Sequence, residues 1–250
     1  MSETLAFPDG HYRFVRGVFP YSAGVAAMPG YEIERARFAR PLSLAEGFAA
    51  IRAHLVRLGR PLTAFCACEL RSPAPFSEQG FRDFNATYVG TLRDWGLFRD
   101  DTNPVARSNV CPEIDPPRAP AFYAFAYTVP AAAGARASFH VAGSGECPEG
   151  RANYRDHIVC RGDVSLAALR EKARWVCAEM ERRMGALGFG WADVSVTQVY
   201  TVHDVHPFLA TELVRRGAAA GGITWHFARP PVVDLDYEMD CSGGAREILL

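Results

Sequence analysis

Three short motifs in this sequence contain residue types that often do chemistry in enzymes. His203 and His206 form a His-x-x-His pair, but it falls on a strand end and the following turn, without accompanying ligands, so a metal site is not favoured. Cys66 and Cys68 alternate along a strand, which favours buried packing, because no neighbouring histidine motif would activate either thiol. The Gly-Ser-Gly run at 143–145 lacks the flanks of a phosphate loop or a nucleophile elbow. We therefore predict no metal site.

Charged side chains are the other source of chemistry. The last strand-like run carries three acids, Asp234, Asp236 and Glu238, whereas the matching run of the first half, 122–125, has none. The formal net charge is −1 and no long block of one sign occurs, which argues against nucleic acid or an anionic membrane surface as a partner. One or two buried arginines can still bind a small carboxylate without changing this balance. The composition is therefore compatible with a small acidic substrate.

Two halves with the same order of elements must position these residues. In the first half, periodicity predicts helices over 42–59 and 77–96 and strands over 63–71, 105–114 and 119–129, with Gly59 as the expected helix C-cap. In the second half it predicts a strand over 135–146, a long helix over 165–188, a strand over 193–204, a short helix within 206–222 and two strands within 223–241. The Ala-, Gly- and Pro-rich segment 128–137 is typical of a linker. We predict an α/β (α+β) fold of two tandem modules, 1–130 and 135–250, each a mixed sheet with helices on one face.

Length and composition fit this division. The 250 residues suit two domains of about 125 residues each. The strand runs carry too little charge for a solvated sheet face, so we expect each open face to pack on a copy of itself, within the chain or between chains. The N-terminus lacks the pattern of a signal peptide, and no apolar stretch is long enough to span a membrane. Seven irregularly spaced cysteines argue against a disulfide framework, so we predict a cytoplasmic protein.

Six short segments, taken in order, resemble one family. They are Pro-Tyr-Ser at 20–22, Asp-Phe-Asn with Tyr88 at 83–88, Ala-Arg-Ser-Asn at 106–109, Phe-His-Val-Ala-Gly-Ser-Gly at 139–145, Val-Tyr with Asp204 at 199–204, and Val-Asp-Leu-Asp-Tyr-Glu at 233–238. In their order and spacing they resemble the RidA (YjgF) family of enamine/imine deaminases, over most of residues 19–129 and 135–242. The resemblance implies RidA-like modules, each similar to the chorismate-mutase-like fold, with a site in the cleft between modules.

The resemblance also implies a substrate anchor. Arg107 matches the family arginine that holds a substrate carboxylate, and a guanidinium suits that task because it can form two charge-assisted hydrogen bonds. The matching stretch of the second half, 221–224, contains no arginine, which implies that this module has lost its anchor. A second cation for a dicarboxylate could come from Arg118 or Arg229.

A family glutamate that orients the attacking water matches the last strand of the second half. The alignment leaves Asp236 and Glu238 both open, and we favour Glu238. By the same resemblance Asn109 assists catalysis, and Tyr21 and Ser144 line the substrate cleft. Arg107 and Glu238 together imply a composite site, with the anchor from one module and the acid from the other.

These matches imply a deaminase that hydrolyses an enamine or imine carboxylate to the oxo acid with release of ammonia, without metal or organic cofactor. Among two-module members, the chain most resembles the deaminases of 2-aminomuconate and 2-amino-5-chloromuconate. A chorismatase-like hydrolase and a non-catalytic small-molecule-binding module are the alternatives. The resemblance further implies a homo-oligomer, either a trimer that forms a pseudo-hexamer or a pseudo-trimeric variant.

Overall fold

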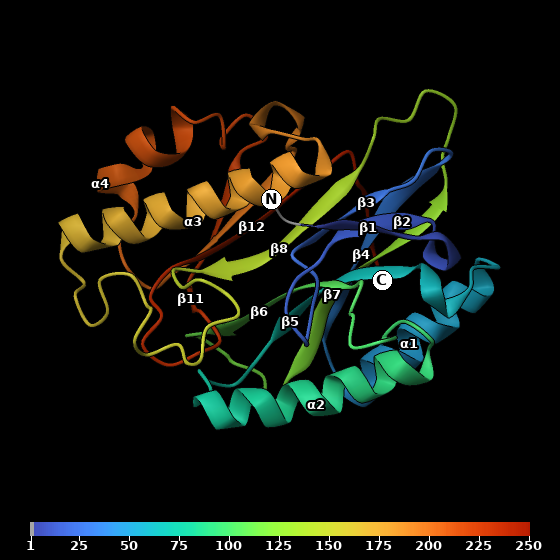
Figure 1. The fold of residues 1–250 in the computed structure, drawn as a ribbon, viewed down its shortest axis with the longest axis horizontal. Helices are drawn as coiled ribbons and strands as arrows, with labels where there is room; N and C mark the ends of the chain where they lie inside the picture. The colour runs from blue at the N-terminus through green and yellow to red at the C-terminus, as the bar shows by residue number, and fades with distance from the viewer. Residues whose placement is uncertain (1–2) are drawn as a thin grey trace.

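The computed structural model describes residues 3–250, which form two mixed β-sheets and four helices (Figure 1). The seven-stranded sheet has the order β1 (Thr4–Phe7), β2 (Tyr12–Val15), β3 (Gly24–Ala27), β8 (Phe139–Gly145), β12 (Glu238–Gly243), β9 (Val196–Tyr200) and β10 (Ile223–His226). The six-stranded sheet has the order β11 (Ala228–Arg229), β6 (Ala106–Pro112), β5 (Phe65–Arg71), β7 (Ala121–Pro130), β4 (Tyr31–Ser43) and β13 (Arg246–Leu249).

Helices cover one face of each sheet. They are α1 (Leu44–Arg57), α2 (Glu78–Asp94), α3 (Leu166–Leu187) and the short α4 (His206–Phe208), which continues as a π-helical turn over Leu209–Val214. Single 3₁₀ turns occupy Pro8–Gly10, Leu62–Ala64 and Trp191–Asp193. Helices α1 and α2 lie on the six-stranded sheet and α3 lies on the seven-stranded sheet, so the predicted α+β class is confirmed (Figure 1).

The helix ends follow from local sequence. The Ser43 hydroxyl and Glu46 carboxylate form a capping box at the start of α1, and serines also cap the starts of α2 and α3. Gly59 follows α1 with a φ of +64°, the left-handed conformation expected of a glycine just past a helix end. The three long predicted helices are therefore confirmed to within a few residues.

The inner faces of the two sheets pack on each other within the chain. Small side chains such as Ala67, Ala106 and Ala142 let the sheets approach, and larger ones such as Tyr12 and Val25 fill the remaining space. One of the two expected packing arrangements, the one within the chain, is therefore observed. The resulting order of layers is helices, sheet, sheet, helix (Figure 1).

The sheets do not follow the chain in two simple blocks. Strands β1 to β3 precede the predicted linker, yet β3 pairs with β8 in the seven-stranded sheet. At the other end of the chain, β13 pairs in parallel with β4 of the six-stranded sheet. The segment between β7 and β8 lies where the linker was predicted, and the division into 1–130 and 135–250 stays a prediction.

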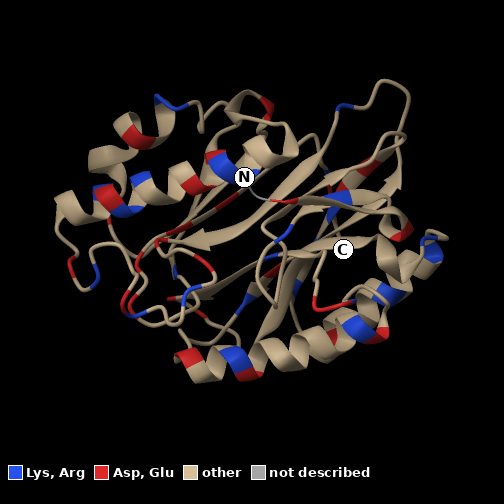
Figure 2. Ribbon diagram, in the orientation of Figure 1, with Lys and Arg blue, Asp and Glu red and all other residues tan. Residues whose placement is uncertain are grey.

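Charges are distributed over both sides of the fold. Figure 2 shows Lys and Arg interleaved with Asp and Glu along α1, α2 and α3. Exposed pairs such as Arg174 with Glu171 account for part of this pattern. Within residues 3–250, no helix is both long and apolar enough to cross a membrane. All seven cysteines are free thiols.

Candidate active site

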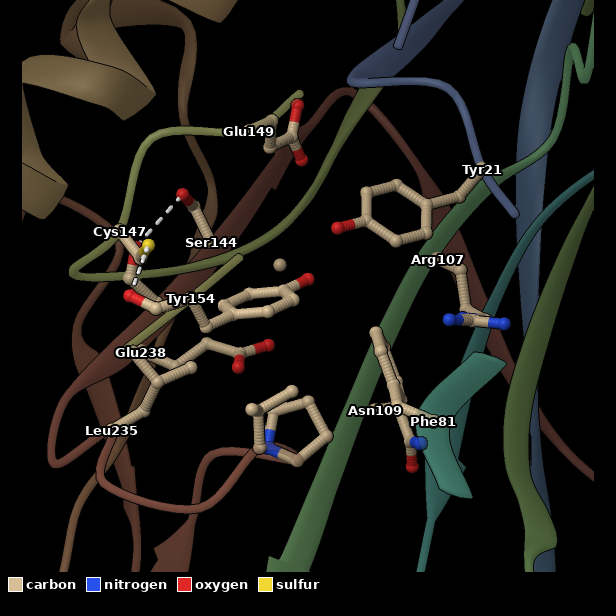
Figure 3. Close-up of a pocket in the computed structure, with 14 residues that line it drawn as sticks. Tyr21, Phe81, Arg107, Asn109, Ser144, Cys147, Glu149, Tyr154, Leu235 and Glu238 are labelled. Carbon is tan, nitrogen blue, oxygen red and sulfur yellow. Dashed lines mark hydrogen bonds between the residues drawn. The ribbon is translucent and has the colours of Figure 1, made fainter. Parts of the chain in front are cut away.

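A small cavity lies where the edge of the six-stranded sheet meets β8 and β12 of the other sheet (Figure 3). Its walls come from both halves of the chain. They consist of Tyr21, Phe81, Arg107, Asn109, Gly143, Ser144, Gly145, Cys147, Glu149, Tyr154, Pro231, Val232, Leu235 and Glu238. Five of the six residues predicted for the site therefore line one cavity, and Asp236 is the exception.

Arg107 on β6 is a buried cation whose hydrogen-bonding capacity is only partly used. Its Nη2 donates to the side-chain oxygen of Asn85 on α2 at 2.8 Å. Its Nε and Nη1 have no hydrogen-bond partner within residues 3–250. The guanidinium lies 4.9–5.7 Å from the ring centres of four aromatic residues: Tyr21, Phe81, Phe84 and Tyr88. A buried cation with two unused donors is a site for an anion, because leaving such donors unpaired is costly.

Glu238, at the start of β12, provides a carboxyl group from the opposite wall of the cavity (Figure 3). The side chain is buried, and burial, together with the nearby Asp240 carboxylate, raises the pKa of Glu238 well above its usual range. Burial therefore favours the neutral form of this group, which can donate a proton. Gly143 on the neighbouring strand gives it room, because a Cβ there would overlap the carboxyl oxygen Oε1 of Glu238.

Asn109 and Arg107 lie two residues apart on β6 and both line the cavity, as strand alternation requires. The Oδ1 of Asn109 accepts a hydrogen bond from the Ser72 hydroxyl at 2.9 Å, while its Nδ2 is buried without a partner in the described chain. Ser108, between them, points the other way and donates to Asp240 at 2.5 Å, which ties the two sheets together. Asn109 is thus a second unused donor on the same wall as Arg107.

Tyr21 and Ser144 also line the cavity. The ring of Tyr21 contacts Arg107 and its hydroxyl points into the cavity, and burial raises the pKa of this phenol well above 10 (Figure 3). It therefore stays protonated and can donate a hydrogen bond. The Ser144 hydroxyl donates to the carbonyl of Gly145 at 3.2 Å.

Asp236 lies outside the cavity in an ion-paired cluster. Its carboxylate binds the Nζ of Lys172, a fully buried side chain, and His203 Nε2 lies 3.1 Å from its Oδ1. Lys172 Nζ also lies 3.4 Å from Glu146. Glu146 accepts hydrogen bonds from the backbone N–H groups of Asp236 at 2.7 Å and Tyr237 at 3.0 Å. The cluster therefore fixes the chain immediately before Glu238. Burial raises the pKa of Glu146 to about 6, against the opposing effect of those backbone donors.

The loop after β8 supplies three cavity residues that the sequence did not suggest, Cys147, Glu149 and Tyr154. Glu149 Oε1 lies 3.1 Å from the Nη2 of Arg183, a fully buried residue of α3. The backbone N–H of Tyr154 donates to Glu78 at the start of α2, at 2.9 Å. This loop has neither helical nor strand periodicity, so only its acidic and aromatic residues could have indicated that it contributes to a site. The second cations considered from sequence, Arg118 and Arg229, do not line the cavity, and Arg229 instead pairs with Glu113 at 2.8 Å.

The cavity thus combines unused cationic and amide donors on one wall with a buried carboxyl group of raised pKa on the other. Glu149 adds a second carboxyl group, whose Oε1 lies 3.1 Å from the Nη2 of Arg183. Two acidic groups in different environments are typical of general acid–base sites. The His-x-x-His pair plays no part in the cavity, since His203 contacts Asp236 and His206 contacts Asp204.

Two sequence comparisons agree on one family. A sequence model described as "2-aminomuconate deaminase CnbZ" matches residues 4–248. A curated 2-amino-5-chloromuconate deaminase from Comamonas testosteroni is 53% identical over 251 residues, which cover 100% of both chains. Among solved structures, a chorismatase gives a TM-score of 0.49 at 15% identity, over 97% of this chain and 85% of that one. The RidA of an Antarctic Psychrobacter gives 0.32 at 16% identity, over 46% of this chain and 92% of its own.

Proposed function

This chain belongs to the 2-aminomuconate deaminase CnbZ family and is a deaminase, and from that premise we propose that it hydrolyses an enamine or imine carboxylate of the 2-aminomuconate type. The products are the oxo acid and ammonia, which makes the enzyme a hydrolase acting on a C–N bond. No metal or organic cofactor enters the proposed reaction.

The buried Arg107 is the observation that carries the proposal. Its free Nη1, together with the second N–H of Nη2, can hold the two oxygens of a carboxylate side by side, and the free Nε offers a further donor. The bond from Nη2 to Asn85 and the surrounding rings prevent the guanidinium from turning away. A carboxylate held there places the adjacent carbon, which carries the nitrogen, between Arg107 and the opposite wall with Glu238.

The reaction begins with a proton transfer to carbon. Neutral Glu238 donates its proton to a carbon of the enamine while the nitrogen lone pair forms the new C=N bond, which gives a protonated imine and leaves Glu238 as a carboxylate. Glu238 suits this step because burial raises its pKa and so favours its protonated form. Asn109, through its free Nδ2, can stabilise charge that develops on the substrate near the anchor.

Water then adds to the imine carbon. We propose that Glu149 accepts a proton from this water and then passes it to the nitrogen of the resulting carbinolamine. The carbinolamine next loses its O–H proton to the Glu238 carboxylate, its C–N bond breaks and ammonia leaves. The sum is enamine plus water giving oxo acid plus ammonia, with no electron lost or gained.

The test is release of ammonia from 2-aminomuconate generated in situ. Wild type should exceed the uncatalysed rate, and Arg107→Ala should lower kcat/KM by roughly 30- to 1000-fold, the cost of a lost bidentate contact. Pyruvate release from chorismate would instead favour a chorismatase-like hydrolase. Binding of carboxylates without turnover would favour a non-catalytic module. Either result would contradict the proposal.

Assembly and location are part of the same proposal. The resemblance to RidA implies a homo-oligomer, a trimer forming a pseudo-hexamer, and the seven free cysteines support a cytoplasmic location. Exposed apolar side chains at the sheet edges, Ile114, Trp225 and Phe227, support association with further copies. Light scattering after gel filtration would give the number of chains, and a monomer would contradict the oligomer.

A further inference from the structure

A second, larger cavity adjoins the site on its solvent side. It has a volume of about 450 Å³, against about 40 Å³ for the inner cavity. The two share Phe81, Glu149 and Tyr154 in their walls. The inner cavity is therefore large enough for an anchored carboxylate and the reacting carbon, and the remainder of a longer substrate must extend into the outer one.

The outer cavity has more positive charge than its own carboxylates satisfy. Glu78 accepts hydrogen bonds from the N–H groups of Tyr154 and Arg155, and Glu149 pairs with Arg183. Two arginines, Arg82 and Arg151, line the same cavity. Arg82 bonds to the neutral Gln79 at 2.9 Å and stays 3.9 Å from Glu78.

Arg151 has no hydrogen bond or ion pair to any described residue. Its guanidinium is thus available to a ligand in the outer cavity. Together with the weakly engaged Arg82, it makes this cavity selective for an anionic group.

Helix α2 provides a measure of the distance between the two positive regions. Asn85 lines the outer cavity and also binds Arg107 of the inner one at 2.8 Å. Arg82 lies three residues earlier on the same helix, so its backbone is roughly one turn, or about 5 Å, from that of Asn85. This offset is on the scale of a six-carbon chain, which suits a substrate with a carboxylate at each end.

We propose that the outer cavity is a second carboxylate subsite, in which Arg151 and Arg82 bind the distal carboxylate of a dicarboxylate substrate. This inference rests on the proposed function for the identity of the reacting end. It makes the two arginines specificity-determining residues, which select dicarboxylates over monocarboxylates of the same length.

Two unreactive ligands that differ only in the distal group provide the test. Muconate carries a carboxylate at both ends of a six-carbon diene, whereas sorbate carries one. Calorimetric titration of wild type should give a Kd at least about tenfold lower for muconate. The double variant Arg82→Ala/Arg151→Ala should lose that preference by weakening muconate alone. Arg155→Ala, on the same loop but outside both cavities, should behave as wild type.

Salt gives an independent readout. Because the two arginines are exposed, raising the ionic strength should reduce the preference for muconate, while a contact at the buried Arg107 should change less. Equal affinities of wild type for the two ligands, including no measurable binding of either, would overturn the subsite, as would equal weakening of both in the double variant. A failure of the proposed function can be distinguished from a failure of the subsite, because ammonia release would then be absent while the preference for muconate over sorbate remained.

Discussion

Gly143 on β8 and Glu238 on β12 lie so close that any side chain at position 143 would occupy the space of the Glu238 carboxyl group. A Cβ at that position would also lie 3.1 Å from the Cα of Ser108, on the other sheet. Ser108 therefore opposes a shift of the backbone at position 143 away from Glu238, so an added side chain would displace the Glu238 carboxyl group instead. The glycine thus determines where the proposed acid points.

Gly143→Ala should accordingly lower kcat for ammonia release by about tenfold or more, with the protein still folded. Gly90→Ala is the matched control, since a Cβ at Gly90 on α2 meets nothing within 4 Å. The control should keep its activity and gain up to about 1 kcal/mol in stability, because alanine is the better helix former. Full activity of Gly143→Ala would contradict the role given to Glu238.

Arg107→Lys should be nearly as damaging as removal of the side chain. Lysine keeps the charge but offers a point charge instead of a planar fork, and its ammonium would lose the aromatic contacts that fit a guanidinium. We expect kcat/KM to fall roughly 10- to 100-fold, measured from initial rates of ammonia release. Arg229→Ala, which changes an exposed arginine outside both cavities, should stay close to wild type. A lysine variant with normal kcat/KM would show that Arg107 does not grip a carboxylate with two bonds.

The activity should decline as pH rises. The pKa of Glu238 in the folded protein is raised by burial, so its neutral, active form prevails below that pKa and is lost above it. Glu238 should also lower the stability of the fold at high pH. Its contribution to the free energy of unfolding is fully present below the pKa that it has in the unfolded chain, and it is lost as the pH rises through the higher pKa that it has in the folded protein.

Glu238→Gln removes this titration. It should be inactive at every pH, and the pH dependence of its urea midpoint should lack the alkaline loss seen in wild type. The difference in pH dependence between wild type and the variant distinguishes the titration of Glu238 from that of neighbours such as Asp240, whose pKa is also raised by burial. An active glutamine variant would exclude Glu238 as the proton donor.

The two acids proposed from sequence should differ in effect. Asp236→Asn weakens an ion pair but leaves Lys172 with Glu146, so we expect a loss of about 1–2 kcal/mol in stability and a rate within about threefold of wild type. Lys172→Met leaves two carboxylates uncompensated and should cost about 3–5 kcal/mol, measured by urea denaturation. If Asp236→Asn abolished turnover in a stable protein, Asp236 would be the catalytic acid.

Glu149→Gln should separate the two halves of the reaction. In D₂O, Glu238 still delivers deuterium to the substrate carbon, so exchange should continue, while ammonia release should fall by roughly 100-fold for want of a base. Nuclear magnetic resonance of the substrate and an ammonia assay follow the two steps. Loss of both steps together would mean that Glu149 acts before water attack or holds the site in shape.

Much of this fold could be predicted from local sequence. Serines at 43, 77 and 165 precede apolar residues at helical spacing, and the three helices begin where those serines cap them. The short strands β1 to β3 could not be predicted in this way, because they join the sheet through β3, which pairs with β8 more than a hundred residues away. Propensity over four residues carries too little information to predict such a contact.

The sequence by itself determined the kind of chemistry: an arginine within Ala-Arg-Ser-Asn, acids in the last strand, and a family resemblance that joined them. It could not decide between Asp236 and Glu238, which have the same charge and the same strand parity. Only the tertiary structure places Glu238 in the cavity and Asp236 against Lys172. The same holds for Glu149 and Arg151, whose positions depend on a loop that packs against α2 of the other half of the chain. Burial and proximity between distant segments set protonation and hydrogen bonding, and these are properties of the packed chain rather than of any stretch of it.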